Sequence, residues 1–66
     1  MNKPDFKISY RAARINCNMS LEDASKKLEI SKYVLQNYES RRTEPSWTMH
    51  EKMAKLYEVP IENLRA

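Results

Sequence analysis

The chain of 66 residues has no glycine, one cysteine and no long apolar run. One cysteine cannot close a disulfide within the chain, and no cysteines and histidines have the spacing of a zinc site. No apolar stretch approaches the roughly 20 residues of a membrane-spanning helix. The N-terminal MNKPDFKISY also lacks the apolar segment of a signal peptide. We therefore expect a cytoplasmic protein without a metal or another cofactor.

The absence of glycine bears on the connections between helices. A helix often ends at a residue with a positive φ angle, which glycine adopts most easily and asparagine next. Asn18 stands just before Met19 and Ser20 and can fill that position. Other helix ends in this chain have to use residues that adopt this conformation less readily.

Hydrophobic residues make up 41% of the chain, and 12 lysines and arginines against 9 acidic residues give a formal net charge of +3. A chain of this length forms one domain with a single thin core, near the smallest size that folds without disulfides or metals. We therefore treat residues 1–66 as one domain. The mildly basic charge is compatible with a polyanionic partner but does not establish one.

Residues 20–39, SLEDASKKLEISKYVLQNYE, contain two short helical patterns joined by a tight turn. The first begins at Ser20, an N-cap residue followed by carboxylates that favour the positive end of a helix. The second begins at Ser31 and places Leu35 and Tyr38 on one side. This is the shape of a helix-turn-helix, in which one helix crosses a DNA backbone and the next enters the major groove.

Apolar periodicity predicts an all-α fold of five helices. They lie at about Asp5 or Ile8 to Cys17, 21–28, 32–39, after Ser46 to about Tyr57, and a short fifth helix from Pro60. In the first helix, Ile15 belongs to a second apolar line, which suggests burial on more than one side. In the fourth, Trp47 begins the apolar face. No β-hairpin pattern is present.

Four segments, in this order and at this spacing, resemble the lambda-repressor-like family of Cro/XRE-type DNA-binding domains. They are RxxRINCNMS (11–20), SLEDASKKLEIS (20–31), LQNYESRRTEPS (35–46) and MAKLYEVPIENL (53–64). The tract from Tyr38 to Ser46 is the most specific, because an aromatic residue and glutamate followed by a basic loop and Pro-Ser is typical of the family. The resemblance implies a compact five-helix domain with its helix-turn-helix at the second and third helices.

The family often has glycine at three positions that are occupied here by Glu29, Arg41 and Glu58. Two outcomes are open at each position. The residue either adopts the left-handed conformation, at a cost on the order of 1 kcal/mol, or the turn is wound differently.

The outward face of the third helix carries the candidate base contacts, Lys32, Tyr33, Gln36 and Asn37. Lys32 can donate to guanine O6 and N7, and Gln36 or Asn37 can pair with adenine N6 and N7. Tyr33 offers its hydroxyl and ring to a thymine methyl or a phosphate, and Val34 is either a core residue or a methyl contact. The resemblance supports Lys32, Tyr33 and Asn37, and Gln36 less. A solvated polar face is the alternative.

Candidate phosphate contacts lie at two helix starts and in a loop. The backbone amides near Ser20 and Leu21, and those near Ser31, suit phosphate oxygens. The family commonly has a glutamine where this chain has Leu21, whose side chain cannot donate, so that contact is lost or replaced by apolar packing. The resemblance places further backbone contacts in the loop after the third helix, at Arg41, Arg42 and Thr43. A solvated basic loop is the alternative there.

Arg14 and Glu39 resemble an ion pair with which the family joins its first and third helices, and we expect a structural role for it. His50 is expected to be partly buried and Cys17 to be a small core residue. A single histidine without a supporting constellation does not make a catalytic triad. We therefore expect no enzymatic activity and no metal ligands.

Together, the residues and the resemblance predict a transcriptional regulator, similar to phage repressors, that occupies an operator in double-stranded DNA. We expect a weak homodimer on two half-sites, because one recognition helix reads only a few base pairs. The pairing surface would use a subset of the apolar residues Trp47, Met49, Tyr57, Val59, Ile61 and Leu64. Three alternatives are an antitoxin that binds DNA and a toxin protein, the controller of a restriction-modification system, and a protein-interaction module that binds no DNA.

Overall fold

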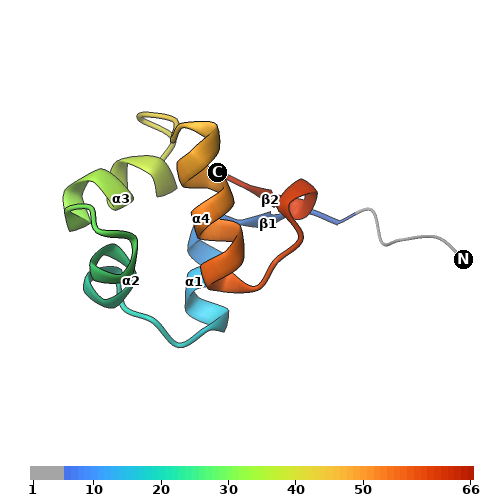
Figure 1. Cartoon of the computed structure of the whole chain (residues 1–66), viewed down its shortest axis with the longest axis horizontal. Helices are drawn as coiled ribbons and strands as arrows, with labels where there is room; N and C mark the ends of the chain where they lie inside the picture. The colour runs from blue at the N-terminus through green and yellow to red at the C-terminus, as the bar shows by residue number, and fades with distance from the viewer. Residues whose placement is uncertain (1–5) are drawn as a thin grey trace, which may run out of the picture.

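The computed structural model describes residues 6–66, which form four short α-helices and a small pair of strands. The elements are β1 (Ile8–Ser9), α1 (Tyr10–Asn16), α2 (Leu21–Leu28), α3 (Lys32–Glu39), α4 (Trp47–Tyr57), the 3-10 helix η1 (Ile61–Asn63) and β2 (Leu64–Arg65). In Figure 1, α2 and α3 lie to one side of α1 and α4, and the strand pair lies to the other. None of the helices within residues 6–66 has the length and apolar character needed to cross a membrane.

Each α-helix begins after a serine whose hydroxyl accepts a hydrogen bond from the amide three residues later. The serines are Ser9, Ser20, Ser31 and Ser46. Such a cap satisfies an amide that has no partner inside the helix, and it typically contributes about 1 kcal/mol. These caps fix the starts of α2, α3 and α4 where the sequence predicts them, and the predicted ends of these helices agree with the structure as well.

The fifth helix predicted from Pro60 is instead a single turn of 3-10 helix, followed by β2. β2 pairs in parallel with β1, with Ile8 opposite Leu64. Because Ile8 is extended in this pairing, α1 begins only after β1; the alternative start at Asp5 lies outside the described residues. The fold is therefore an all-α helix-turn-helix arrangement to which one short strand pair, not predicted from the sequence, is added.

Side chains strengthen the connection between the two ends of the described chain. Lys7 Nζ donates to the carbonyl of Glu62 at 2.8 Å. Asn63 Nδ2 donates to the carbonyl of Phe6 at 2.6 Å. The segment before α1 is thereby fastened to η1 as well as to β2.

The core lies where the four helices and β2 meet. Its buried apolar residues are Tyr10, Ala13, Ala24, Leu28, Leu35, Met53, Ala54, Tyr57 and Leu64. Two residues predicted on apolar helix faces are at the surface, since Ile15 is 47% exposed and Trp47 is 65% exposed. The expectation fails for Ile15 because the buried residues of α1, Tyr10, Ala13 and Arg14, lie on one side of the helix, and Ile15 lies on the exposed side. It fails for Trp47 because this residue is the first of α4, at the edge of the core.

The turns answer the question raised by the missing glycine. Within residues 6–66, four residues have a positive φ angle, namely Asn18 (59°), Glu29 (61°), Arg41 (68°) and Glu58 (58°). Of the two outcomes open for the last three, the left-handed conformation is therefore the one that the structure contains. Glu29 ends α2 and Glu58 ends α4, so the chain carries strain at two helix ends that glycine would relieve.

Replacing Glu58 with glycine should raise the free energy of unfolding by about 1 kcal/mol, because glycine lacks the Cβ that clashes in this conformation. In a domain of this size, that gain corresponds to a melting temperature about 4–8 °C higher. Glu51→Gly is the matched control, since Glu51 is an exposed glutamate inside the same helix and glycine there should cost about 1 kcal/mol. Thermal unfolding followed by circular dichroism measures both, and a loss of stability in both variants would contradict the prediction.

Candidate nucleic-acid interface

α3 presents a polar face to solvent. Leu35, which has no exposed surface, is the buried residue that attaches this helix to the core, and Tyr38 packs partly against the same core. On the other side lie the four candidate base contacts, of which the first three are exposed and the last is half-buried: Lys32, Tyr33, Gln36 and Asn37. The structure thus places all four together on or beside one accessible face.

The start of this face combines a charge with apolar groups. Tyr33 is 69% exposed. Val34, for which the sequence allowed either a core position or a surface contact, is 36% exposed. Tyr33 directly follows the exposed Lys32, and Val34 comes two residues after Lys32, on a different side of the helix. The Tyr33 ring or the Val34 methyl groups can contact a thymine methyl, and the Lys32 ammonium can donate to a base.

The start of α3 is suited to an anion. Its first turn has no acidic residue, and the Ser31 hydroxyl accepts from the amide of Val34 at 3.1 Å. The first amides of a helix have no partner within the helix and carry part of its positive dipole. The amides next to Ser31 can therefore point at a phosphate without competition from a carboxylate.

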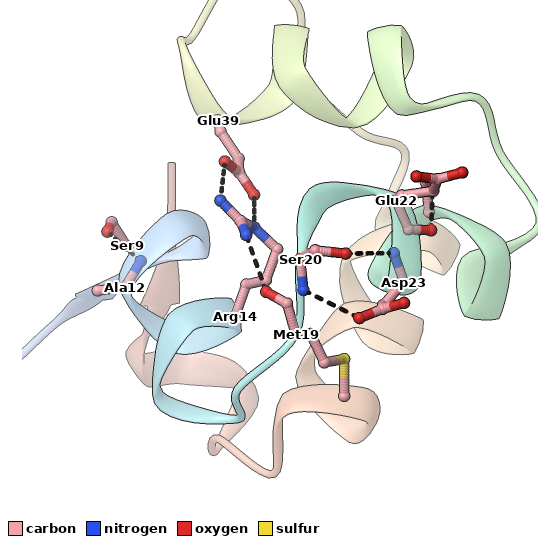
Figure 2. Close-up of polar contacts among 9 residues, drawn as sticks. Ser9, Ala12, Arg14, Met19, Ser20, Glu22, Asp23 and Glu39 are labelled. Atoms are coloured by element: carbon pink, nitrogen blue, oxygen red, sulfur yellow. Dashed lines mark hydrogen bonds and ion pairs between the residues drawn. The ribbon is translucent and has the colours of Figure 1, made fainter.

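The start of α2 is different, because it is capped by its own carboxylate. Ser20 Oγ accepts from the Asp23 amide at 3.0 Å, and Asp23 Oδ2 accepts from the Ser20 amide at 3.3 Å (Figure 2). The hydrogen bond from the Ser20 amide to the Asp23 carboxylate, followed by the interaction of that carboxylate with the Ser20 side chain, lowers the pKa of Asp23. Glu22 adds a second carboxylate to the same turn. The Ser20 amide is thus engaged, and a phosphate near Leu21 would meet two negative charges.

Arg14 and Glu39 form an ion pair between α1 and the end of α3 (Figure 2). Arg14 Nε donates to Glu39 Oε2 at 2.8 Å and Nη2 donates to Oε1 at 3.2 Å, while Nη1 donates to the Met19 carbonyl at 2.9 Å. The two side chains are only 9% and 6% exposed. One guanidinium therefore connects α1, the end of α3 and the loop that leads into α2.

The two arginines of the loop between α3 and α4 are placed differently. Arg41 Nη2 donates to the carbonyl of Ala66 at 3.4 Å, so this guanidinium lies against the C-terminal segment. Thr43 is exposed. Arg42 lines a polar hollow of about 280 Å³ together with Gln36 and Asn37 of α3 and Ser40, which follows that helix. Of the two arginines, Arg42 is the one beside the candidate base contacts.

Arg11 was not singled out from the sequence, but the structure places it beside the same residues. It is exposed on α1 and lines a hollow with Leu21, Gln36 and Ser40. Arg11 precedes Arg14 by three residues, a spacing that puts two side chains on one side of a helix. That spacing is the signal in the sequence that could have identified it.

His50 is half-buried, and its ring nitrogens are engaged within the protein. The Ile61 carbonyl, 3.1 Å from Nε2, can only accept, so Nε2 carries the proton and Nδ1 accepts from the Tyr10 hydroxyl at 2.9 Å. Trp47 stacks on the imidazole with ring centroids 5.5 Å apart. Cys17 is half-buried against the core. Within residues 6–66, no three histidine, cysteine, aspartate or glutamate side chains are grouped so that they could hold a metal ion.

Comparison with known families agrees with this geometry. A family model described as helix-turn-helix, of the Cro/C1 type, matches residues 11–64. The matched segment runs from Arg11 in α1 to Leu64 in β2 and contains all the candidate contacts described above. Searches among curated proteins and among solved structures gave no match.

Proposed function

The chain belongs to the Cro/C1-type helix-turn-helix family, a family of DNA-binding transcription regulators, and we propose that it occupies a specific operator in double-stranded DNA as phage repressors do. The observation that supports this proposal most is the division of α3 into two sides. Leu35 holds one side in the core, and the other presents Lys32, Tyr33 and Gln36 to solvent. A helix attached in this way can enter the major groove without disturbing the core.

Sequence would be read by hydrogen bonds and apolar contacts to base edges. The Lys32 ammonium is a donor for the O6 and N7 atoms of guanine, and the Asn37 amide can pair with N6 and N7 of adenine. Tyr33 and Val34 supply apolar surface for a thymine methyl. Gln36 is exposed at the margin of this face, between two hollows that contain arginines, so it can serve a base or a phosphate.

Regulation would follow from occupancy alone. A domain that covers promoter DNA excludes RNA polymerase, and one bound beside the promoter can recruit it; neither effect requires a chemical reaction. The antitoxin and restriction-modification alternatives use the same DNA contacts at other loci. Selection of bound sequences from random duplex DNA tests the proposal. We expect one enriched sequence with two related halves, and the absence of enrichment would contradict specific binding.

Arg42→Ala should weaken binding to every DNA sequence by a similar factor and make the salt dependence shallower by about one unit of slope. Arg41→Ala should change the slope less, because its guanidinium already donates to the Ala66 carbonyl. Fluorescence anisotropy between about 50 and 200 mM salt, on the selected operator and on an unrelated duplex, measures both slopes. An unchanged slope for Arg42→Ala would place the loop away from the DNA backbone. Wild-type binding that is insensitive to salt would instead favour a protein-interaction module.

We further propose that the protein binds its operator as a weak dimer through the end of α4 and η1. A groove of about 500 Å³ at this end of the molecule is lined by three apolar residues that are at least partly exposed, Val59, Pro60 and Ile61, beside the charged Glu51, Lys55 and Glu58. Tyr57 and Leu64 are buried in the core and are not available for pairing. A groove of this size supports only a small interface, so we expect association to depend on DNA.

Sedimentation should give two protein chains on a duplex that carries the full operator and one chain on a duplex that carries a half-site. The reason is geometric, because two-fold related recognition helices reach half-sites about one helical turn apart. Ile61→Lys, which places a charge in the groove, should leave half-site binding intact and weaken the second binding event on the full operator. A ratio of one protein chain per full operator at saturation would contradict the dimer model. It would favour the alternative that the groove binds a different protein, as an antitoxin requires.

A further inference from the structure

We propose that Arg11 of α1 binds a DNA phosphate at the start of α2, and that it replaces the side-chain donor that Leu21 lacks. The inference rests on the proposed function, because the anion is a phosphate of the bound operator. It assigns a contact to a helix outside the helix-turn-helix itself.

The place for the phosphate is a hollow of about 350 Å³ between three helices. α1 contributes Arg11 and Arg14, and α2 contributes its first residue, Leu21. The second half of α3 contributes Gln36 and Glu39, and Ser40, which follows the helix, completes the lining. Figure 2 shows two of these residues, Arg14 and Glu39, between α1, α3 and the start of α2. The hollow therefore lies directly beside α3, the helix that reads the bases in the proposed function.

Within residues 6–66, one positive charge of the hollow has no charged partner. Arg14 and Glu39 neutralise each other through two hydrogen bonds, at 2.8 and 3.2 Å. Arg11 is exposed and forms no hydrogen bond or ion pair with any other residue of the described part of the chain. Since the pair is already satisfied, an anion that enters the hollow is attracted by the Arg11 guanidinium. The Gln36 amide lies beside it as a neutral donor, whereas the Ser40 hydroxyl already donates to the Asn37 carbonyl at 3.4 Å.

The start of α2 cannot supply this attraction. Its Ser20 amide is engaged by the Asp23 carboxylate at 3.3 Å, and Glu22 stands in the same turn. Two carboxylates offset the positive dipole of the helix start and repel a phosphate. The Leu21 side chain has no donor. An anchor for the DNA backbone at this point must therefore come from across the hollow, where Arg11 lies.

Arg11 and Arg42 would then hold the backbone on two sides of α3. Gln36 and Ser40 line both hollows, one with Arg11 and the other with Arg42. A guanidinium carries five donors in a planar fork and can bind a phosphate through two of them at once. Two such contacts would fix how deeply α3 enters the groove, although neither carries sequence information.

The test compares Arg11→Ala, Arg11→Lys and a control, Arg65→Ala, in the full chain. Arg65 is exposed on β2, away from α2 and α3. Arg11→Ala should reduce the salt slope by about one unit and lower affinity about tenfold at 0.1 M salt, equally for operator and unrelated duplexes. Arg11→Lys should keep the slope because it keeps the charge. All three variants should melt at the wild-type temperature, since both arginines are exposed.

A second substitution locates the lost contact. Leu21→Gln added to Arg11→Ala restores a neutral donor at the start of α2, and it should recover affinity without recovering the slope. In the wild-type background the same substitution should change affinity less, because Arg11 already holds the phosphate. No recovery in the double variant would place the lost contact elsewhere and overturn the assignment to this hollow.

The failure of this inference can be distinguished from the failure of the proposed function. If the wild type binds duplex DNA with a steep salt slope and Arg11→Ala has the same slope, Arg11 touches no phosphate and the inference is wrong. If the wild type binds no duplex DNA, or binds it without salt dependence, the proposed function is wrong, and the inference that rests on it is wrong as well.

Discussion

Glu39→Gln should lower the free energy of unfolding by about 3–5 kcal/mol, since it leaves the Arg14 guanidinium buried without its opposite charge. The pair is 9% and 6% exposed and is bonded at two positions. A domain of this size has a stability of roughly 5 kcal/mol, so most of it would be lost. Urea unfolding followed by circular dichroism measures the change. Glu51→Gln, an exposed glutamate of α4, is the control and should change stability by less than about 0.5 kcal/mol.

A paired substitution separates the cost of an orphaned charge from the value of the ion pair. Arg14→Met combined with Glu39→Leu removes both charges and fills the space with apolar side chains, a replacement that is often neutral or stabilising. We expect the double variant to be more stable than either single variant, with a large coupling energy in the double-mutant cycle. Additive losses would show that the two side chains act independently.

Each of three single substitutions, Lys32→Ala, Tyr33→Ala and Asn37→Ala, should reduce the preference for the operator over random DNA by about 1–3 kcal/mol. A loss of 1.4 kcal/mol is a tenfold loss of preference. The effect is on discrimination because base contacts carry sequence information, whereas phosphate contacts do not. Competition binding with an unlabelled random duplex measures the ratio directly. Lys52→Ala, an exposed lysine of α4, removes the same charge from another helix and should leave the ratio unchanged.

The three variants should remain folded, because Leu35 rather than these side chains holds α3 in the core. Wild-type melting temperatures with reduced discrimination are therefore the expected pattern. If all three variants kept full sequence preference, the reading face would have to lie elsewhere. Retained preference in Tyr33→Ala alone would assign Tyr33 to the backbone rather than to a base.

Local chemistry explains why much of the fold was predictable. Ser20, Ser31 and Ser46 can each accept a bond from an amide one turn later, and each does so, so the starts of α2, α3 and α4 could be located from sequence. The left-handed turns at Glu29 and Glu58 were one of two options that followed from the missing glycine. These features depend on residues three or four positions apart.

The resemblance indicated one distant contact, the Arg14–Glu39 ion pair, but other features that depend on distant partners were missed. The strand pair joins Ile8 to Leu64, and two-residue strands show no periodicity that a sequence could reveal. The bond from Arg41 to the Ala66 carbonyl likewise depends on where the chain turns in space. The sequence located Ser20 as the N-cap of α2, but the hydrogen bond from its amide to the Asp23 carboxylate was not predicted. Arg11 was overlooked for a related reason, because the hollow that it lines is formed by residues of three helices that are distant in the sequence.

The parallel pairing of β1 with β2 also determines how the domain would respond to mechanical force. When strands run parallel, the incoming end of β1 and the outgoing end of β2 lie at opposite ends of the ladder. Tension applied at residues 6 and 66 therefore loads the pair in shear, so its bonds must yield together rather than one after another. The bonds from Lys7 to Glu62 and from Asn63 to Phe6 share that load. Until the β1–β2 pair and these two side-chain bonds break, the tension is not transmitted to α2 and α3. A pull on the chain ends therefore leaves α3, the proposed recognition helix, in place.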